Sequence, residues 1–500
     1  MVGPRSQAQI VLSSLLTVLI AVGFFESCRS PEHEKRNVLF ISVDDLRPSL
    51  GCYGAVGAKT PVLDKLAASG TRFDRAYCQM ASCGPSRAAV MTGCRPDTNG
   101  VQDLTTSYRE ALPNLVVLPE LFRKNGWFTA ALGKVQHGPP TGPLAGKLDD
   151  PRAWSVPCWR PARWQTYYGS ENARRVQREL EEEAQRAADE RGDGIVWAVP
   201  RGLAWDAPDV DDSELGDGMI ADRAIEMLEE HAGEPFFLAL GFLKPHMPYV
   251  APKRYWDLHS KESLPALIEQ DSPQGSPALA LHDSREVRVH ANIPLEGELP
   301  AETRANLVHA YYACTSYIDA QIGRVLAKLD ELGLADNTIV VVWGDHGWHL
   351  GEQGVFGKHT NYESAVRSPL LIRVPGETQV AASDSFVELI DLYPTLAELC
   401  GLQAPQAIEG SSFAAQLTSD DSPGKDAVFH QYARAHPGRK MQSIGHAIRT
   451  DTHRYIEWTH PRMPLERELY DLVVDPEELT NIVESSPVLA RQLQSRLRSQ

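Results

Sequence analysis

The stretch NVLFISVDD, from Asn37 to Asp45, decides the fold. Its largely apolar run is typical of a strand that is buried on both faces, as in a parallel sheet covered by helices. Two adjacent carboxylates directly after such a strand are costly to bury unless a cation balances them or one of them caps a helix or turn. The stretch therefore predicts a central strand that delivers Asp44 and Asp45 to one edge of a sheet.

Three further apolar runs have the same character, and each also ends near a polar cluster. The runs are Phe128–Leu132, Phe236–Phe242 and Thr338–Trp343; the clusters are Lys134 with His137, Lys244-Pro245-His246, and Asp345-His346. Helical patterns at Ala221–Glu230 and Thr303–Leu332 lie between the runs, which predicts an α/β fold with a large, mostly parallel sheet sandwiched by helices. Because ligands of such sheets bind outside the carboxyl ends of the strands, the four clusters predict one convergent site.

The pattern changes near the C-terminus to short strands and a final helix. We expect strands at Ala427–Tyr432, Gly445–Arg449, Arg454–Trp458 and Glu468–Val474, and a helix at Pro487–Arg498. These elements predict a smaller antiparallel α+β subdomain at residues 425–500, after a catalytic domain at residues 37–412. Residues 139–215, with a charged helix at Arg174–Glu190, and the Pro-rich residues 264–300 are expected to be surface insertions, the second a long loop at the rim of the site.

Composition limits the partners. The 500 residues carry 49 Lys and Arg against 66 Asp and Glu, a formal net charge of −17. Nucleic acid is excluded as a partner because neutralising phosphates requires a basic face. An anionic substrate would need cations concentrated in the pocket itself. The oligomeric state stays open.

The N-terminus predicts export to the periplasm or the extracellular space. Arg5 precedes an apolar run at Ile10–Phe25, which suits a signal peptide at residues 1–28 better than a membrane anchor, the alternative reading. Cys28 would be the lipid anchor of a lipoprotein, although Phe25-Glu26-Ser27 matches such a cleavage site poorly. Export permits disulfides, but the wide cysteine spacing gives no framework, and Cys314 is expected to be buried packing.

A hard divalent cation is expected at the convergent site. Asp44, Asp45 and Asp345 offer carboxylates and His346 an imidazole, a set that suits Ca²⁺ or Mg²⁺. The histidine leaves zinc open, but three carboxylates disfavour it.

Cys83 is a candidate nucleophile. In Cys83-Gly84-Pro85-Ser86-Arg87, the proline suits a first helical turn, so the thiol is expected at a helix N-terminus with Arg87 one turn along. Free N–H groups and the helix dipole favour an anion or thiolate there.

The same motif, followed by Thr92-Gly93, resembles the modification motif of type I sulfatases in the alkaline-phosphatase superfamily. The order of the other clusters over roughly residues 37–395 fits that family, and Glu468–Asp471 resembles part of its C-terminal subdomain. Four stretches look most similar to the iduronate-2-sulfatase group and its bacterial relatives: Asp44–Pro48, Arg95–Thr98, Gly133–His137 and Lys244–Pro248.

The resemblance implies a chemistry. A separate formylglycine-generating enzyme would oxidise Cys83 to formylglycine, whose hydrate attacks sulfur and then expels sulfate. The implied cation is Ca²⁺, favoured over Mg²⁺, and its ligands would be Asp44, Asp45, Cys83, Asp345 and His346. The implied catalytic residues are Arg87 and Lys134 at the diol, His137 as a base, and His246 and Lys358 on the sulfate and leaving oxygen.

The implied substrate is a sulfated saccharide, with a 2-O-sulfated uronic acid favoured; sulfate position and exo or endo action stay open. Two alternatives remain: a phosphomonoester or phosphodiester hydrolase of the same superfamily, and a non-catalytic carbohydrate-binding protein. Arg95 and Asp97 are expected to fix a loop rather than to bind substrate, and His349 and His359 to be loop residues.

Overall fold

The computed structural model describes residues 35–137, 149–161, 168–192, 201–268, 271–377, 380–419, 422–435 and 442–500. Asn37–Gln500 forms one compact unit. The predicted signal peptide, with Cys28, lies outside the described residues and stays a prediction. Among the described helices, none combines the length and the apolar character that crossing a bilayer would require.

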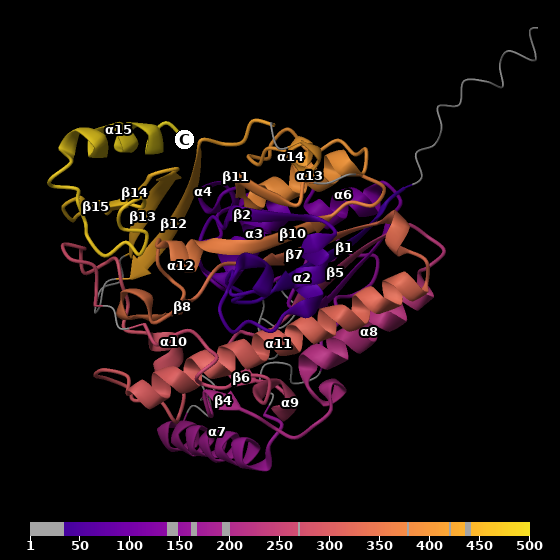
Figure 1. Ribbon diagram of the computed structural model, residues 1–500, viewed down its shortest axis with the longest axis horizontal. Coiled ribbons are helices and arrows are strands. Elements are labelled where there is room, and N and C mark those ends of the chain that lie inside the picture. The colour runs from indigo at the N-terminus through magenta and orange to yellow at the C-terminus, as the bar shows by residue number, and fades with distance from the viewer. Residues whose placement is uncertain are drawn as a thin grey trace, which may run out of the picture. The chain divides into compact units, whose positions relative to one another are not determined.

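A seven-stranded sheet forms the centre of this unit (Figure 1), with the strand order β11-β2-β10-β7-β1-β5-β3. The strands are β1 (Asn37–Val43), β2 (Thr71–Tyr77), β3 (Phe128–Gly133), β5 (Phe236–Phe242), β7 (Thr338–Gly344), β10 (Arg367–Arg373) and β11 (Ala382–Glu388). Only β10 runs antiparallel to its neighbours in this sheet. All four predicted strands are present, so the mostly parallel sheet is confirmed.

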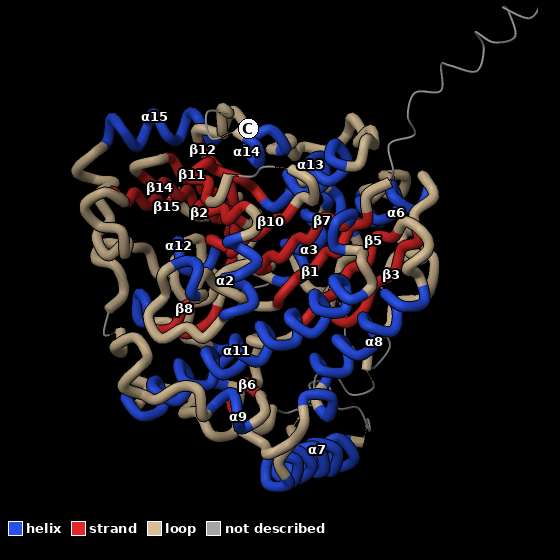
Figure 2. Tube along the Cα trace, turned by 45° about the vertical axis from the view of Figure 1, so that its right-hand side comes forward, coloured by secondary structure: helices blue, strands red, loops and turns tan. Residues whose placement is uncertain are grey.

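Helices cover both faces of the sheet (Figure 2). Successive side chains of a strand point to opposite faces, so each strand packs against the helices on both sides. From β1, Leu39 and Ile41 pack in one apolar cluster with α2 (Pro61–Ala68), α8 (Gly216–Glu230) and α11 (Ala301–Glu331). Val38 and Phe40 pack in a second cluster with α3 (Cys83–Thr92), α6 (Leu118–Lys124) and α13 (Leu392–Leu399). The predicted α/β sandwich is therefore confirmed.

The remaining helices and strands before the C-terminal sheet lie mainly in connections. They are α4 (Pro96–Asn99), α5 (Tyr108–Ala111), α7 (Glu171–Arg191), α9 (Lys253–Trp256), α10 (Arg285–Arg288), α12 (Glu363–Val366), α14 (Ala414–Thr418), β4 (Trp205–Asp206), β6 (Tyr249–Val250), β8 (His349–Leu350) and β9 (Phe356–Gly357). The charged helix predicted in the first insertion is α7, and most of its side chains are exposed. The predicted rim loop contains the short helix α10.

The C-terminal part is an antiparallel sheet, as predicted. Its order is β12-β13-β14-β15, formed by Ala427–Ala435, Gln442–Thr450, His453–Thr459 and Glu466–Asp471, and α15 (Pro487–Leu497) packs on it. The last strand ends at Asp471 rather than at the predicted Val474, and the side chains of Val473 and Val474 are largely exposed. Because residues 37–500 form one compact unit, the division into 37–412 and 425–500 stays a prediction.

Among the described cysteines, Cys52, Cys78, Cys83, Cys94, Cys158 and Cys314 are free thiols. Cys314 is fully buried in the apolar cluster around α11. The expectation of buried packing at this position is confirmed.

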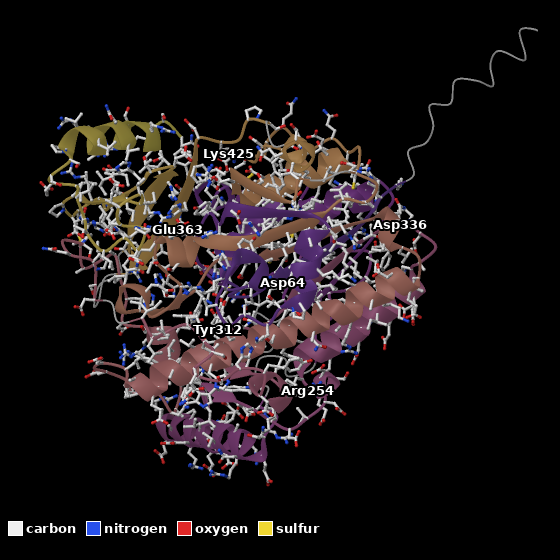
Figure 3. The ribbon with its side chains drawn as sticks, in the orientation of Figure 1. Asp64, Arg254, Tyr312, Asp336, Glu363 and Lys425 are labelled. Atoms are coloured by element: carbon white, nitrogen blue, oxygen red, sulfur yellow. The ribbon has the colours of Figure 1, made fainter. Side chains whose placement is uncertain are left out.

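Arg454 in β14 connects the C-terminal sheet to α12, the short helix that precedes β10 of the large sheet. It is fully buried, and its guanidinium lies 2.5 Å from carboxylate oxygens of both Glu363 in α12 and Glu478. Figure 3 labels Glu363 beside the C-terminal sheet. Both acids lose their main positive partner if Arg454 is removed.

We expect Arg454→Met to lower the free energy of unfolding by about 3–5 kcal/mol, because the substitution leaves buried carboxylates uncompensated. Urea unfolding at neutral pH measures this loss. Arg498→Met is the control: Arg498 is half exposed, pairs with Glu457 at 2.9 Å, and should cost less than about 1 kcal/mol. Equal losses in the two variants would contradict a special role for Arg454.

Candidate active site

The register of the sheet brings the predicted clusters together. Val43, at the end of β1, lies opposite Phe242 of β5 and Gly344 of β7. Gly133, at the end of β3, lies opposite Gly241. The four strands therefore end at the same edge, and the residues that follow them meet there.

Gly133 and Gly241 permit a close approach between β3 and β5. Gly133 has a φ of +75°, and a Cβ there would lie 2.3 Å from the carbonyl oxygen of Gly241. A Cβ on Gly241 would lie 2.0 Å from the carbonyl carbon of Lys134. Only glycine avoids these overlaps while the chain turns, so the pair sets where Lys134 enters the site.

The predicted ligand set is assembled and fully buried. Ligand atoms of Asp44, Cys83, Asp345 and His346 lie within 4.8 Å of one another. Asp45 belongs to a second, overlapping group, and its backbone N–H donates to Asp345 Oδ1 over 3.0 Å. The 4.8 Å span is about twice the roughly 2.3–2.6 Å that separates Ca²⁺ from its oxygen ligands, so a single ion fits between these atoms.

One atom of this group supports a bound cation directly. Asp45 Oδ2 is buried and has no hydrogen-bond partner among the described residues. Burial raises the pKa of Asp45 well above its usual value although Lys358 acts to lower it. A carboxylate oxygen in this situation is costly unless a cation or donor satisfies it.

Cys83 is the first residue of α3, as predicted, and Gly93 ends that helix in the left-handed conformation. The thiol is 2% exposed. Its Sγ lies 3.3 Å from Lys358 Nζ and 3.4 Å from His346 Nε2. The sulfur therefore sits between a cation and the ligand cluster.

Arg87 contacts the carboxylates rather than the thiol. Its Nε donates to Asp345 Oδ2 over 2.9 Å, and its Nη2 donates to Asp44 Oδ1 over 3.2 Å. A further N–H donates to Ser42 Oγ over 3.0 Å. Arg87 is fully buried, so these contacts fix the two aspartates.

Two lysines balance the remaining charge. Lys134 Nζ pairs with Asp44 Oδ2, and Lys358 Nζ lies 2.7 Å from Asp45 Oδ1. Burial acts to raise the pKa of Asp44, but the charges of Lys134, His246 and Arg87 outweigh it and hold that pKa well below its usual value. With Arg87, three cations face three carboxylates, so the residues alone carry little net charge and a divalent ion would add a positive excess that attracts an anion.

His246 reaches the cluster from the turn after β5. Lys244 is buried, and its Nζ donates to the carbonyl oxygens of His246 and Pro248 over 2.8 and 2.6 Å, which fixes the turn. His246 Nδ1 lies 2.6 Å from the carbonyl oxygen of Met247. With a proton on Nδ1 donated to that oxygen, Nε2 is directed toward Asp44, 3.9 Å away.

A cavity of about 270 Å³ lies over Cys83. The predicted residues Lys134, His137, His246 and Lys358 line it with Cys83. Burial, with a smaller contribution from Lys134, lowers the pKa of His137 to about 3, and its Nδ1 has no partner among the described residues. The predicted residues therefore place two lysines and two imidazoles around one thiol in this cavity.

Sequence reasoning missed three ionisable residues of this cavity. Glu286 from α10, the exposed Arg201, and His359 also line it. His359, expected to be an uninvolved loop residue, has a φ of +70° and lies at the cavity, whereas His349 lies in β8 and bonds Thr360 Oγ1 over 2.8 Å. The prediction of a rim loop at residues 264–300 pointed to the segment of Glu286, but no motif marks the residue.

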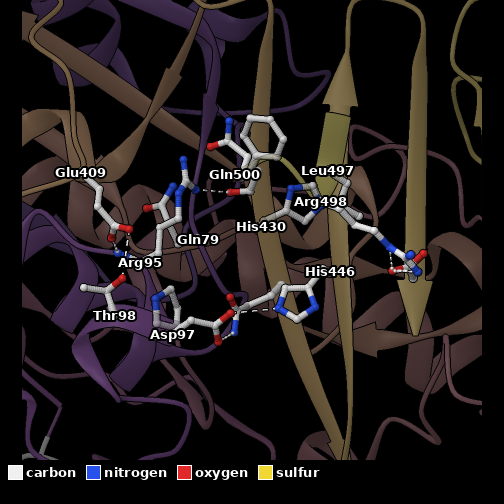
Figure 4. A pocket seen from close by; sticks show the side chains of 14 residues that line it. Gln79, Arg95, Asp97, Thr98, Glu409, His430, His446, Leu497, Arg498 and Gln500 are labelled. Carbon is white, nitrogen blue, oxygen red and sulfur yellow. Dashed lines mark hydrogen bonds and ion pairs between the residues drawn. The ribbon is translucent and has the colours of Figure 1, made fainter. Parts of the chain in front are cut away.

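Arg95 and Asp97 lie in a different pocket, of about 370 Å³, beside β12, β13 and α15 (Figure 4). Arg95 forms a bidentate ion pair with Glu388, with N–O distances of 2.7 and 2.9 Å. Asp97 bonds His446 over 3.0 Å and Gln431 over 2.8 Å. These contacts tie the loop after α3 to β11 and to the C-terminal sheet, which supports the expected structural role.

A family profile described as "Sulfatase" matches residues 36–402, and one described as "N-sulphoglucosamine sulphohydrolase, C-terminal" matches residues 351–500. The chain belongs to the sulfatase family. This sulfatase is 31% identical over 514 residues to iduronate 2-sulfatase of Homo sapiens, covering 90% of the chain and 89% of the relative. It is 32% identical over 479 residues to a sulfatase of Formosa agariphila, covering 91% and 86%. The resemblance read from the motifs is confirmed, and the chain is a sulfuric ester hydrolase.

Solved structures agree on the fold. A phosphonate monoester hydrolase of Agrobacterium radiobacter superposes with a TM-score of 0.70 at 23% identity, covering 93% of this sulfatase and 95% of that chain. A protein in complex with its substrate D-glucosamine-2-N,6-O-disulfate gives 0.69 at 22% identity, covering 93% and 97%. These likenesses confirm the alkaline-phosphatase-like α/β fold of the sulfatase.

Proposed function

We propose that this sulfatase hydrolyses a sulfate ester on a saccharide, with a 2-O-sulfated uronic acid as the favoured leaving group. The observation that carries the proposal is the Cys83 thiol between Lys358 and His346, under a cavity with further cationic and imidazole groups. The human relative named iduronate 2-sulfatase supports the choice of sugar. Arg201, exposed and lining the same cavity, offers a guanidinium that pairs well with a sugar carboxylate.

The proposed nucleophile is formylglycine, made from Cys83 by a formylglycine-generating enzyme. Burial raises the pKa of the Cys83 thiol well above its usual value, so a thiolate nucleophile is disfavoured in this position. A hydrated aldehyde supplies two hydroxyls: one attacks sulfur, and the other allows the enzyme-bound sulfate to be expelled. A plain thiol or serine lacks the second hydroxyl.

The proposed cation is Ca²⁺, held by Asp44, Asp45, Asp345 and His346 together with residue 83. It would supply the positive charge that attracts sulfate and acidifies a hydroxyl. Mg²⁺ is less favoured because it usually keeps several waters, whereas this cluster offers many protein ligands. Arg87 holds Asp44 and Asp345 in place through its hydrogen bonds to both carboxylates.

The chain's own residues have separable tasks. Lys134 and Lys358 place positive charge beside residue 83, where negative charge develops on the transferring sulfate. His137 stays neutral at neutral pH because burial lowers its pKa to about 3. Its Nδ1 has no partner among the described residues, and His137 is proposed as the base that takes a proton when sulfate is expelled. His246 lines the cavity, and to donate a proton to the leaving oxygen it would have to carry one on Nε2 as well as the one on Nδ1. Burial holds the pKa of His246 well below its usual value, whereas Asp44 and Glu286 favour this charged form.

We expect His246→Ala to lower kcat/KM for a saccharide sulfate by roughly 10²–10⁴-fold, because a sugar alkoxide leaves poorly without a proton. The loss should be much smaller for 4-nitrophenyl sulfate, since a nitrophenolate leaves unprotonated. Sulfate release from both substrates measures the difference. Equal losses would contradict the assignment of His246 to the leaving oxygen.

The experiment that tests the function uses protein produced with the modifying enzyme. We expect sulfate release from 2-sulfated uronide disaccharides, less from 6-sulfated hexosamines, and little phosphate release from phosphomonoesters or phosphodiesters. A preference for the phosphate esters would favour the alternative hydrolase, and binding of the sugars without turnover would favour a carbohydrate-binding protein. We also propose that the protein is exported to the periplasm or the extracellular space, either free or anchored by a lipid on Cys28.

A further inference from the structure

Glu286 places a carboxylate in a cavity that otherwise suits an anion. Its Oε1 lies 3.0 Å from Lys358 Nζ and 3.5 Å from His246 Nε2, and it lines the same cavity as Cys83. A negative charge beside Lys358 weakens the attraction of that lysine for sulfate. Sulfate binding alone therefore does not explain why a carboxylate stands here.

This carboxylate is ionised and has a spare acceptor. Burial acts to raise the pKa of Glu286, but the charges of Lys358, His359 and His246 outweigh it and hold the pKa far below its usual value. Oε2 is buried and bonds no described residue; His359 Nδ1, at 3.9 Å, is too distant for a hydrogen bond. A buried, unsatisfied oxygen of this kind is stabilised when a ligand brings a donor to it.

The residues that contact Glu286 indicate which part of the substrate would carry this hydrogen-bond donor. Glu286 contacts His246, which the proposed function assigns to the leaving oxygen, and Lys358, which it assigns to the transferring sulfate. A group that reaches Glu286 therefore lies next to the ester oxygen, on the leaving sugar. On a pyranose, the substituent nearest to the ester is the one on the adjacent ring carbon.

We propose that Glu286 determines leaving-group specificity: it accepts a hydrogen bond from a hydroxyl or N–H on the carbon next to the sulfated one, and it repels a second anionic group there. The proposal rests on the proposed sulfatase function. In a 2-sulfated uronide the donor is the 3-hydroxyl, while the carboxylate on C5 lies farther round the ring. A sugar with a sulfate on the adjacent carbon would need another sulfatase to act first.

The test compares three synthetic uronides that share a 2-sulfate: the 3-hydroxy compound, its 3-deoxy analogue and the 2,3-disulfate. The wild type should prefer the 3-hydroxy compound. In Glu286→Gln, which keeps the size of the side chain and removes its charge, kcat/KM for the 3-hydroxy compound should fall by roughly 10- to 100-fold. It should change little for the 3-deoxy analogue and rise for the 2,3-disulfate.

Asp283→Asn is the matched control, because Asp283 is an exposed carboxylate on the same segment and does not line the cavity; its substrate preference should equal that of the wild type. Equal losses on all three compounds in Glu286→Gln would mean that Glu286 only positions Lys358 and His246, which overturns the proposal. A wild type that does not distinguish the 3-hydroxy from the 3-deoxy compound overturns it without any variant. A wild type that releases sulfate from none of the saccharide esters instead overturns the proposed function.

Discussion

Cys83→Ala should lower kcat for saccharide sulfates by at least roughly 10⁴-fold, because the variant retains the cavity but has no side chain that becomes the nucleophile. Binding should persist, since Lys134, His246 and Lys358 still line the cavity. Cys83→Ser should also fail to turn over: a serine ester of sulfate has no second hydroxyl to expel it. Single-turnover and steady-state sulfate release distinguish these two variants.

Cys94→Ala is the matched control for the loss of a buried cysteine near α3. Cys94 is also fully buried, follows the C-terminal end of the same helix, and bonds only carbonyl oxygens through its sulfur. Its activity should stay within a few-fold of the wild type. Retention of full activity in Cys83→Ala, or a comparable loss in Cys94→Ala, would contradict the role of residue 83.

Removal of the divalent cation should abolish turnover and also destabilise the fold. Asp44, Asp45 and Asp345 are all fully buried within one cluster, so an ion bound there stabilises the folded chain. At a concentration 100 times its Kd, the ion should contribute about 2.7 kcal/mol to the free energy of unfolding. Chelation followed by urea unfolding measures the loss, and Ca²⁺ should restore stability and activity better than Mg²⁺.

Asp45→Asn should weaken cation affinity, measured by calcium titration, because it removes a charge whose Oδ2 has no other partner among the described residues. Asp319→Asn is the control: Asp319 is an equally buried carboxylate whose oxygens accept from the backbone N–H groups of Val62 and Leu63. It should leave the affinity unchanged. Unaltered stability and activity after chelation would contradict a cation at the cluster.

Four strands of the large sheet, β1, β3, β5 and β7, could be predicted because they are largely apolar. The strands β2, β10 and β11 were not predicted, since each carries charged residues. Asn37–Val43 and Phe236–Phe242 match the observed strands in full, since burial on both faces leaves an unbroken apolar run. The convergence of Asp45 and Asp345 followed from the rule that parallel strands end at one edge. The end of β15 was missed because Val473 and Val474 extend the apolar pattern although both are exposed.

Other parts of the site could not be predicted from sequence. Glu286 lines the cavity from α10, in the long loop at residues 264–300. No motif around Glu286, and no spacing from the other site residues, predicts that this loop reaches the cavity. Arg87 was expected beside the nucleophile, since it follows Cys83 by one turn, yet its contacts are with Asp44 and Asp345. Helical spacing gives the direction of a long side chain only roughly, and the buried charges decide where its guanidinium binds.

The most direct test of the account is the mass of the tryptic peptide Ala76–Arg87, which contains residue 83. In active protein produced with the modifying enzyme, we expect the mass loss that converts a thiol into an aldehyde, localised by fragmentation to residue 83 and absent from Cys78. Sulfatase activity should rise in proportion to the modified fraction. Full activity in protein whose Cys83 is entirely unmodified would contradict the account.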